Sequence, residues 1–181
     1  MKFLIVVDTQ IDFITGALAN KEAQKRLPNV VNKIIEAQKK NYEVILTQDT
    51  HYDNYLETLE GKKLPVPHCI VGTDGHKIVK EVRDILKAPS YTSKRTFGDL
   101  DIGRFLEEMA YDNEENVDEI EIIGFVSSIC VISNALILRA SFPNVPIIID
   151  ASCCAGLTKE DHDAAMTVAQ CCQIDVINWE R

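Results

Sequence analysis

Residues 121–135 read EIIGFVSSICVISNA, and this stretch decides the fold class. The apolar run that ends at Gly124 is too short for a helix and is bounded by a glycine, so it is typical of a buried strand. Gly124 permits a sharp exit from that strand, and Ser127 or Ser128 can cap a helix that follows. Cys130 then falls in the first helical turn. A strand, a tight turn and a helix in this order predict one unit of an α/β sheet.

The position of Cys130 has a chemical consequence. Unpaired N–H groups and the helix dipole stabilise an anion at a helix N-terminus, and the thiolate is the nucleophilic form of cysteine. The same N–H groups could hold the oxyanion that forms when a thiolate attacks a carbonyl carbon. The alternative is a buried cysteine that acts as a small apolar residue. Reactive side chains elsewhere in the sequence must decide whether Cys130 is a nucleophile or a buried apolar residue.

The composition limits the class of protein. The chain has 181 residues, of which 46% are hydrophobic and 26% charged, and this predicts a single domain over 1–181 with a substantial core. The formal net charge of -9 argues against nucleic acid and anionic membrane as partners, because both require clustered Lys and Arg. This charge does not argue against a small-molecule substrate.

Cysteine use and the N-terminal sequence indicate a cytoplasmic protein. The six cysteines include no CxxC pair, and adjacent cysteines at 153–154 and 171–172 make a poor disulfide framework. The apolar run at 3–7 is shorter than the core of a signal peptide, and no segment approaches the length of a membrane span. A reducing cytoplasm fits these features best.

Apolar runs alternate with helical patterns along the whole chain. This alternation predicts a three-layer α/β protein, in which helices cover both faces of a central, mostly parallel, six-stranded Rossmann-like sheet. The strands are expected at 3–7, 43–47, 90–94, 120–123, 145–149 and 174–177, and the helices at 23–40, 77–86, 102–111, 127–142 and 159–172. Residues 52–75 are expected to be a long loop, which in a compact domain is usually functional.

Reactive side chains stand where predicted strands end, namely Asp8, Asp49, His51, Lys94 and Cys130. The carboxyl ends of the strands line the ligand crevice of an open α/β sheet, so these side chains should converge. Asp8 would take the thiol proton as a general base, and Lys94 would stabilise both anions. Considered alone, Asp8 could simply end a turn and Lys94 could be a solvated lysine.

A second group of residues has the chemistry of a metal site. The pattern Asp49-Thr50-His51 on an extended segment places the two outer side chains on the same side. With His68 and a carboxylate from Glu57 or Glu60, they form a set suited to zinc, manganese or iron. The alternative is a group of polar residues on a surface loop.

These motifs together resemble a known family, the isochorismatase-like cysteine hydrolases, and the nicotinamidases are the nearest branch. The similarity rests, in this order, on DTQIDF (8–13), DTH (49–51), PHC (67–69), Lys94, GFVSSICV (124–131) and DASCCAG (150–156). It spans almost the whole chain, and the ordered combination is more specific than any single motif.

The resemblance implies a catalytic triad of Asp8, Lys94 and Cys130. It also implies a cis peptide bond at Phe125–Val126, with the N–H groups of Val126 and Cys130 directed at the substrate oxygen. The substrate pocket would be lined by Phe13 and Gln10.

By the same resemblance Asp49, His51 and His68 would bind a divalent transition metal, with zinc preferred to manganese or iron. Nicotinamidases often have a further histidine as a ligand, and here Glu60 is expected in its place, in preference to Glu57. The segment 52–75 would then be an insertion that serves metal and substrate. Many nicotinamidases also carry a tryptophan just before the last ligand, whereas this chain has LPVP at 64–67.

These inferences predict a cysteine amidohydrolase that cleaves a small, nicotinamide-like carboxamide to the acid and ammonia through a thioester on Cys130. One alternative is a metal-independent hydrolase of an N-carbamoyl or other small amide. Another is a catalytically silent binding protein on the same fold. The resemblance also implies a homo-oligomer. The remaining histidines, His76 and His162, are expected to be structural or solvated.

Overall fold

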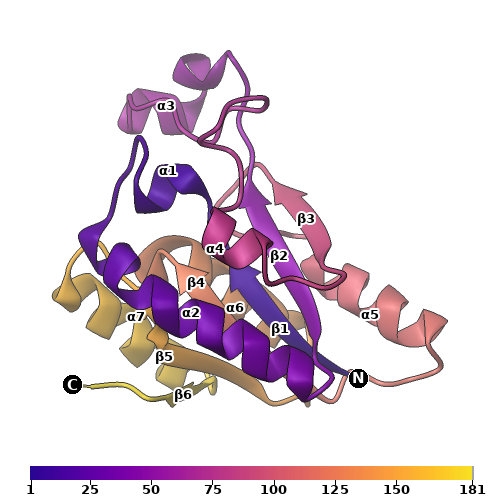
Figure 1. Cartoon of the computed structure of the whole chain (residues 1–181). Coiled ribbons are helices and arrows are strands. Elements are labelled where there is room, and N and C mark those ends of the chain that lie inside the picture. Colours follow the sequence, from indigo (N-terminus) through magenta and orange to yellow (C-terminus); the bar gives the residue numbers. More distant parts are fainter. Residues whose placement is uncertain (181) are drawn as a thin grey trace.

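Six parallel strands form the central sheet, in the order β3-β2-β1-β4-β5-β6 (Figure 1). The computed structural model describes residues 1–180. The strands are β1 (Lys2–Val7), β2 (Glu43–Asp49), β3 (Ser90–Lys94), β4 (Glu119–Phe125), β5 (Ile147–Ala155) and β6 (Asp175–Ile177). The predicted six-stranded α/β architecture is thus confirmed, with every strand pair parallel. The strand order reverses between β1 and β4, which is where an open sheet of this kind binds its ligand.

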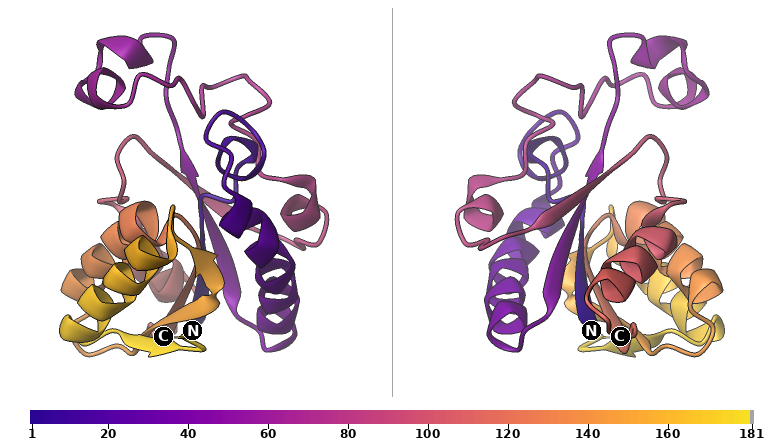
Figure 2. Two further views of the ribbon diagram at one scale, coloured as in Figure 1. Left: turned by 90° about the vertical axis from the view of Figure 1, so that its left-hand side faces the viewer. Right: turned by 90° about the vertical axis from the view of Figure 1, so that its right-hand side faces the viewer.

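Helices cover both faces of the sheet. The long α2 (Lys21–Lys39) lies on one face with the short α1 (Ile11–Ile14) and α4 (Lys80–Arg83), and the other face carries α5 (Ile102–Asp112), α6 (Ile132–Ser141) and α7 (Lys159–Cys171) (Figure 2). In β1, the side chains of Phe3, Ile5 and Val7 enter one core, and those of Leu4 and Val6 enter the other, because strand side chains alternate. Burial on both faces explains the continuous apolar run of this strand.

The sequence prediction ended the fifth strand too early. A strand over 145–149 was expected, whereas β5 continues to Ala155. The register between β4 and β5 shifts between Ile122 and Gly124, so the polar residues after Ile149 belong to an irregular part of the strand. Asp150 stays buried in this part because the Nζ atom of Lys33 lies 2.7 Å from its carboxylate.

Gly124 lies inside β4, one residue before its end, because β4 passes very close to β1 there. Its φ angle is +117°, and a Cβ atom at this position would lie 2.2 Å from the carbonyl oxygen of Val7. Only glycine allows both the backbone conformation and the close approach. The chain then leaves β4 at Phe125 for the element that carries Cys130.

Residues 52–75, here called the cap segment, project beyond the carboxyl ends of the strands (Figure 1). The segment was expected to be a loop, but it contains a 3-10 turn, η1 (Tyr55–Glu57), and the helix α3 (Leu59–Lys63). Thr58 begins this helix, and its hydroxyl accepts the N–H of Gly61 at 3.0 Å. After the cap segment, α4 covers only Lys80–Arg83, so the helix predicted over 77–86 is shorter than expected.

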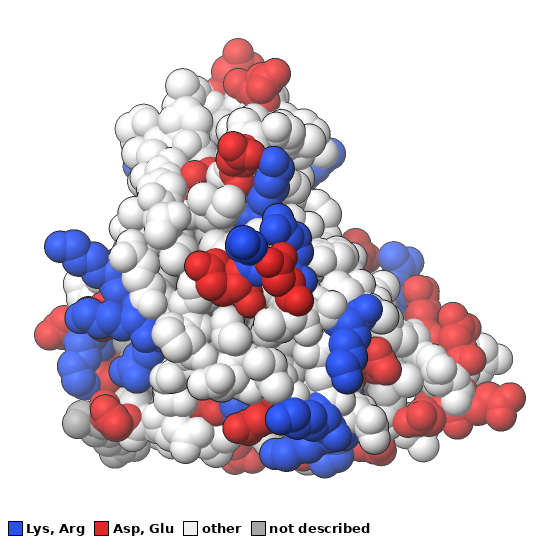
Figure 3. Space-filling model, viewed as in Figure 1, with Lys and Arg blue, Asp and Glu red and all other residues white. Residues whose placement is uncertain are grey.

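The surface charge is mixed on the face that carries α2 and α4, where Lys and Arg lie among Asp and Glu (Figure 3). None of the helices within residues 1–180 combines the length and the apolarity needed to cross a bilayer.

Candidate active site

Three predicted residues meet where β1, β3 and β4 end. The Nζ atom of Lys94, the last residue of β3, lies 2.7 Å from Oδ2 of Asp8 and 3.6 Å from Sγ of Cys130. All three residues are buried. The ammonium group thus stands between a carboxylate and a thiol that are far apart in the sequence. Their convergence follows from the parallel sheet, since Asp8 directly follows β1.

The carboxylate of Asp8 is held on two sides. The Oγ1 hydroxyl of Thr47 donates to Oδ1 of Asp8 at 2.6 Å, and Lys94 pairs with Oδ2. Asp8 has a φ angle of +46°, a left-handed conformation that aspartate tolerates better than most residues. Sequence reasoning missed Thr47. Its signal was a hydroxyl directly after the apolar residues 44–46 of β2, at the position that pairs with Val7.

Cys130 lies in a π-helical turn, η2 (Ser127–Val131), which continues into α6. The peptide bond Phe125–Val126 is cis, as the resemblance implied. The carbonyl oxygen of Val126 accepts the N–H groups of both Ile129 and Val131 at 3.1 Å. The predicted serine cap is absent, because the residue before η2 is Val126 and no side chain caps the turn. π turns often occur at functional sites.

The electrostatics of Cys130 differ from the sequence expectation. Burial raises the pKa of the Cys130 thiol well above its usual value, Asp8 adds to this effect, and Lys94 opposes it. Burial therefore favours the protonated thiol, against the stabilisation of a thiolate expected at the start of a helix. Burial also raises the pKa of the Asp8 carboxyl, again against the charge of Lys94. A carboxylate with raised proton affinity is well suited to accept the proton of a neighbouring thiol.

The predicted metal ligands also come together. One ligand atom from each of Asp49, His51 and His68 lies within 4.8 Å of the others, and all three residues are buried. Oδ2 of Asp49 is 3.0 Å from Nε2 of His51 and 3.4 Å from Nε2 of His68. Oε1 of Glu60, in α3, lies 3.7 Å from both imidazoles, whereas Glu57 is exposed. The geometry therefore favours Glu60 over Glu57 as the fourth group.

Both imidazoles direct their Nε2 atoms toward this cluster. The carbonyl oxygen of Val66 lies 2.9 Å from Nδ1 of His68, which leaves Nε2 of that ring to face Asp49. Nε2 of His51 is buried, and although Oδ2 of Asp49 lies 3.0 Å away, the pair lacks good hydrogen-bond geometry. A poorly satisfied, buried nitrogen beside two carboxylates and a second imidazole fits a transition-metal ion. The cluster adjoins the triad, because Oδ1 of Asp49 is 3.6 Å from Nζ of Lys94.

Gln10 has a role that the sequence prediction did not include, namely holding the backbone of Asp49. Its side chain is fully buried, with Oε1 accepting the N–H of Asp49 at 2.7 Å and Nε2 donating to the carbonyl of Asp49 at 2.9 Å. Nε2 also donates to the carbonyl of His76. Gln10 therefore positions the backbone of a candidate ligand. Periodicity could not reveal this bond, because it joins two strand ends.

Aromatic rings surround the cluster. The ring centroid of Phe13, a predicted pocket residue, lies 5.6 Å from that of His68. Tyr55 was missed in the sequence, and its ring lies 4.7 Å from His51 and 5.1 Å from His68. His76 and His162, which were expected to be structural or solvated, each contact a side-chain hydroxyl. Nε2 of His76 lies 3.1 Å from a threonine hydroxyl, and Nδ1 of His162 lies 2.8 Å from a serine hydroxyl.

The isochorismatase domain model matches residues 2–181, which is almost the full length. The chain belongs to the isochorismatase family. No curated protein sequence matches it significantly.

Solved structures extend the comparison of this isochorismatase-family chain. The pyrazinamidase of Pyrococcus horikoshii in complex with zinc has 24% identity and a TM-score of 0.81, over 98% of this chain and 99% of that chain. The pyrazinamidase/nicotinamidase of Streptococcus mutans has 25% identity and a TM-score of 0.80, over 98% of this chain and 100% of that chain. The N-carbamoylsarcosine amidase of Thermoplasma acidophilum has 23% identity and a TM-score of 0.75, over 97% and 94%. Family membership identifies an isochorismatase-family chain, and these solved structures share its fold over nearly the full length.

Proposed function

We propose that the protein is a cysteine amidohydrolase that cleaves a small, nicotinamide-like carboxamide to the acid and ammonia. The observation that carries this proposal is the position of the Lys94 ammonium, 2.7 Å from Asp8 and 3.6 Å from the Cys130 sulfur. A buried lysine between a base and a thiol stabilises the anion that either group forms. A silent binding protein would have no need for three buried reactive groups in this arrangement.

The first half of the proposed reaction forms a thioester. Asp8 takes the thiol proton, and the Cys130 thiolate attacks the amide carbon. The N–H groups of Val126 and Cys130 would hold the oxyanion of the tetrahedral intermediate. When that intermediate collapses, the C–N bond breaks and Asp8 returns its proton to the leaving nitrogen, so ammonia departs and the acyl group stays on Cys130.

The second half releases the acid. Asp8, now a carboxylate again, takes a proton from a water molecule whose oxygen attacks the thioester carbon. The C–S bond breaks, the sulfur leaves as a thiolate, and the proton held by Asp8 returns to it. Lys94 keeps its charge throughout and opposes the build-up of negative charge between Asp8 and Cys130.

Asp49, His51, Glu60 and His68 would hold a divalent transition metal, with zinc as the first candidate and manganese or iron as alternatives. Nitrogen and oxygen donors of this kind suit these ions. When bound, the metal would supply a Lewis-acid site that anchors a ring nitrogen of the substrate or a water molecule. Phe13, whose ring packs beside His68, would form one wall of the adjoining substrate site.

A screen for ammonia release tests the proposal. The substrates are nicotinamide, pyrazinamide, N-carbamoyl amino acids and simple aliphatic amides, each with and without a chelator. Cys130→Ala should abolish ammonia release, and Cys153→Ala is the matched control, because Cys153 is a buried cysteine on β5. Full turnover by Cys130→Ala would refute the mechanism. Full activity of metal-free protein on a carbamoyl substrate would favour the metal-independent alternative.

Two further properties belong to this proposal. All six cysteines are free, which is typical of a protein from a reducing compartment, and we expect a cytoplasmic location. We also expect a homo-oligomer, on the resemblance alone, and light scattering on the purified protein would measure its mass.

A further inference from the structure

The side chain of Ser127 joins the nucleophile's helix to another part of the fold. Ser127 is the first residue of η2 and is fully buried. Its Oγ atom lies 2.8 Å from Nδ1 of His162 in α7. The Ser127 hydroxyl thus hydrogen-bonds to a residue 35 positions later in the chain, and does not cap the backbone of its own turn.

Backbone contacts hold His162 in place. Its N–H donates to the carbonyl of Thr158 at 3.2 Å, and the Thr158 hydroxyl caps α7 by accepting the N–H of Asp161 at 3.1 Å. A Cβ atom at Gly156 would lie 2.7 Å from the backbone nitrogen of His162, so the turn after β5 packs directly against it. Asn20 donates to the carbonyl of Gly156 at 2.9 Å and ties this turn to the start of α2. His162 thus stands on a rigid support.

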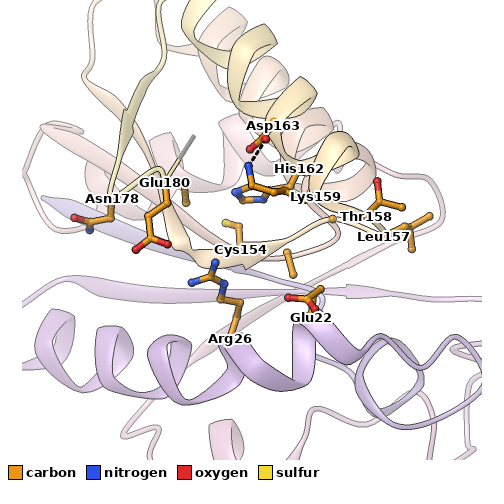
Figure 4. A pocket seen from close by; sticks show the side chains of 13 residues that line it. Glu22, Arg26, Cys154, Leu157, Thr158, Lys159, His162, Asp163, Asn178 and Glu180 are labelled. Carbon is orange, nitrogen blue, oxygen red and sulfur yellow. Dashed lines mark hydrogen bonds and ion pairs between the residues drawn. The ribbon is translucent and has the colours of Figure 1, made fainter.

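The imidazole also borders a recess between α2 and α7, which has a volume of about 520 Å³ (Figure 4). The side chains of Arg26, Cys154 and His162 face one another across it. Burial lowers the pKa of His162; the charge of Asp163 opposes this effect, and the charge of Arg26 adds to it. Burial thus favours the neutral imidazole in its bond to Ser127.

We propose that His162 is a positioning residue for the nucleophile: through Ser127 it fixes the first turn of η2, and with it the Sγ atom of Cys130. The two residues lie in one π turn, so a rotation of Ser127 carries Cys130 with it. Sγ is only 3.6 Å from Nζ of Lys94 in a closed, buried site. A displacement of about 1 Å in such a site can lower a rate roughly 100-fold. The inference rests on the proposed role of Cys130.

The test removes the bond from each side in turn. His162→Leu and Ser127→Ala should each lower kcat about ten- to hundredfold with little change in KM, and slow the iodoacetamide alkylation of Cys130. The double variant should be no slower than the slower single variant, because both changes break one bond. His162→Asn should recover most of the rate, since its amide nitrogen can stand where Nδ1 stands.

Arg26→Gln is the matched control, because Arg26 lines the same recess but is not a member of the Ser127–His162 hydrogen bond. Its kcat should stay near that of the original protein. The proposal is overturned if His162→Leu and Ser127→Ala lower the melting temperature but leave kcat unchanged. It is also overturned if the fold-decrease in kcat of the double variant equals the product of the two single decreases. Should His162→Leu fail to fold, Ser127→Ala removes a single oxygen atom and supplies the same readouts. A fully active Cys130→Ala would refute the nucleophile instead, so the two failures are distinguishable.

Discussion

Replacing Lys94 with methionine should leave a buried negative charge without its partner. The side chains of Lys94 and Asp8 are 1% and 0% exposed, and their charged atoms are 2.7 Å apart. Removing one member of such a pair costs about 3–5 kcal/mol, because the remaining charge has neither water nor a counter-ion. We expect Lys94→Met to lower the free energy of unfolding by this amount at pH 7.

An ion pair on the surface, between Lys77 and Asp74, supplies a control of the same chemistry. Lys77 lies 2.6 Å from Asp74, but the two side chains are 59% and 87% exposed. Water already solvates both charges, so Lys77→Met should destabilise the protein far less than Lys94→Met. Urea unfolding followed by circular dichroism measures both variants, with a chelator present so that no metal ion compensates the charge near Lys94.

The pH dependence gives a second measurement on the same variant. Lys94 opposes the rise in the pKa of both Asp8 and Cys130, so its loss should raise both values further. In Lys94→Met, the rise of the Cys130 alkylation rate with pH should therefore occur at a higher pH than in the original protein. The difference in unfolding free energy between the two proteins should shrink in acid, where Asp8 is protonated and uncharged. Equal urea midpoints for Lys94→Met and Lys77→Met would refute the reasoning.

Two further predictions concern groups outside the triad. Burial alone would raise the pKa of Asp150, but the bond to Lys33 and two weaker bonds outweigh it and lower the pKa. A carboxyl group with a lowered pKa stabilises the folded protein above about pH 4, and this stabilisation is lost as the pH falls. Lys33→Met should therefore lower the free energy of unfolding, measured in urea, by less in acid than at neutral pH. A loss of stability that does not change with pH would contradict this prediction. Oδ2 of Asp12 accepts the N–H of Cys69, the residue after His68, at 2.8 Å. Asp12→Asn should weaken zinc binding about tenfold or more in chelator competition, and unchanged affinity would rule out this support.

The sequence by itself determined the sheet and the location of its reactive edge. Apolar runs such as 3–7 report burial on both faces, and the helices between them force parallel strands. Asp8 and Lys94 could be singled out because each stands at the end of a strand, and parallel strands end at one edge. These properties are local in the chain, so pattern and order were sufficient to predict them.

Tertiary structure alone decided the contacts that give those residues their setting. The bonds of Thr47 to Asp8, of Gln10 to Asp49 and of Ser127 to His162 each join segments 35 or more residues apart. Side-chain periodicity reports which face a residue occupies, but not which distant atom it meets. The effect of burial on the pKa of Cys130 could not be predicted for the same reason. A helix start is visible in sequence, whereas the burial that outweighs it exists only once the sheet, α6 and α7 have packed around the sulfur.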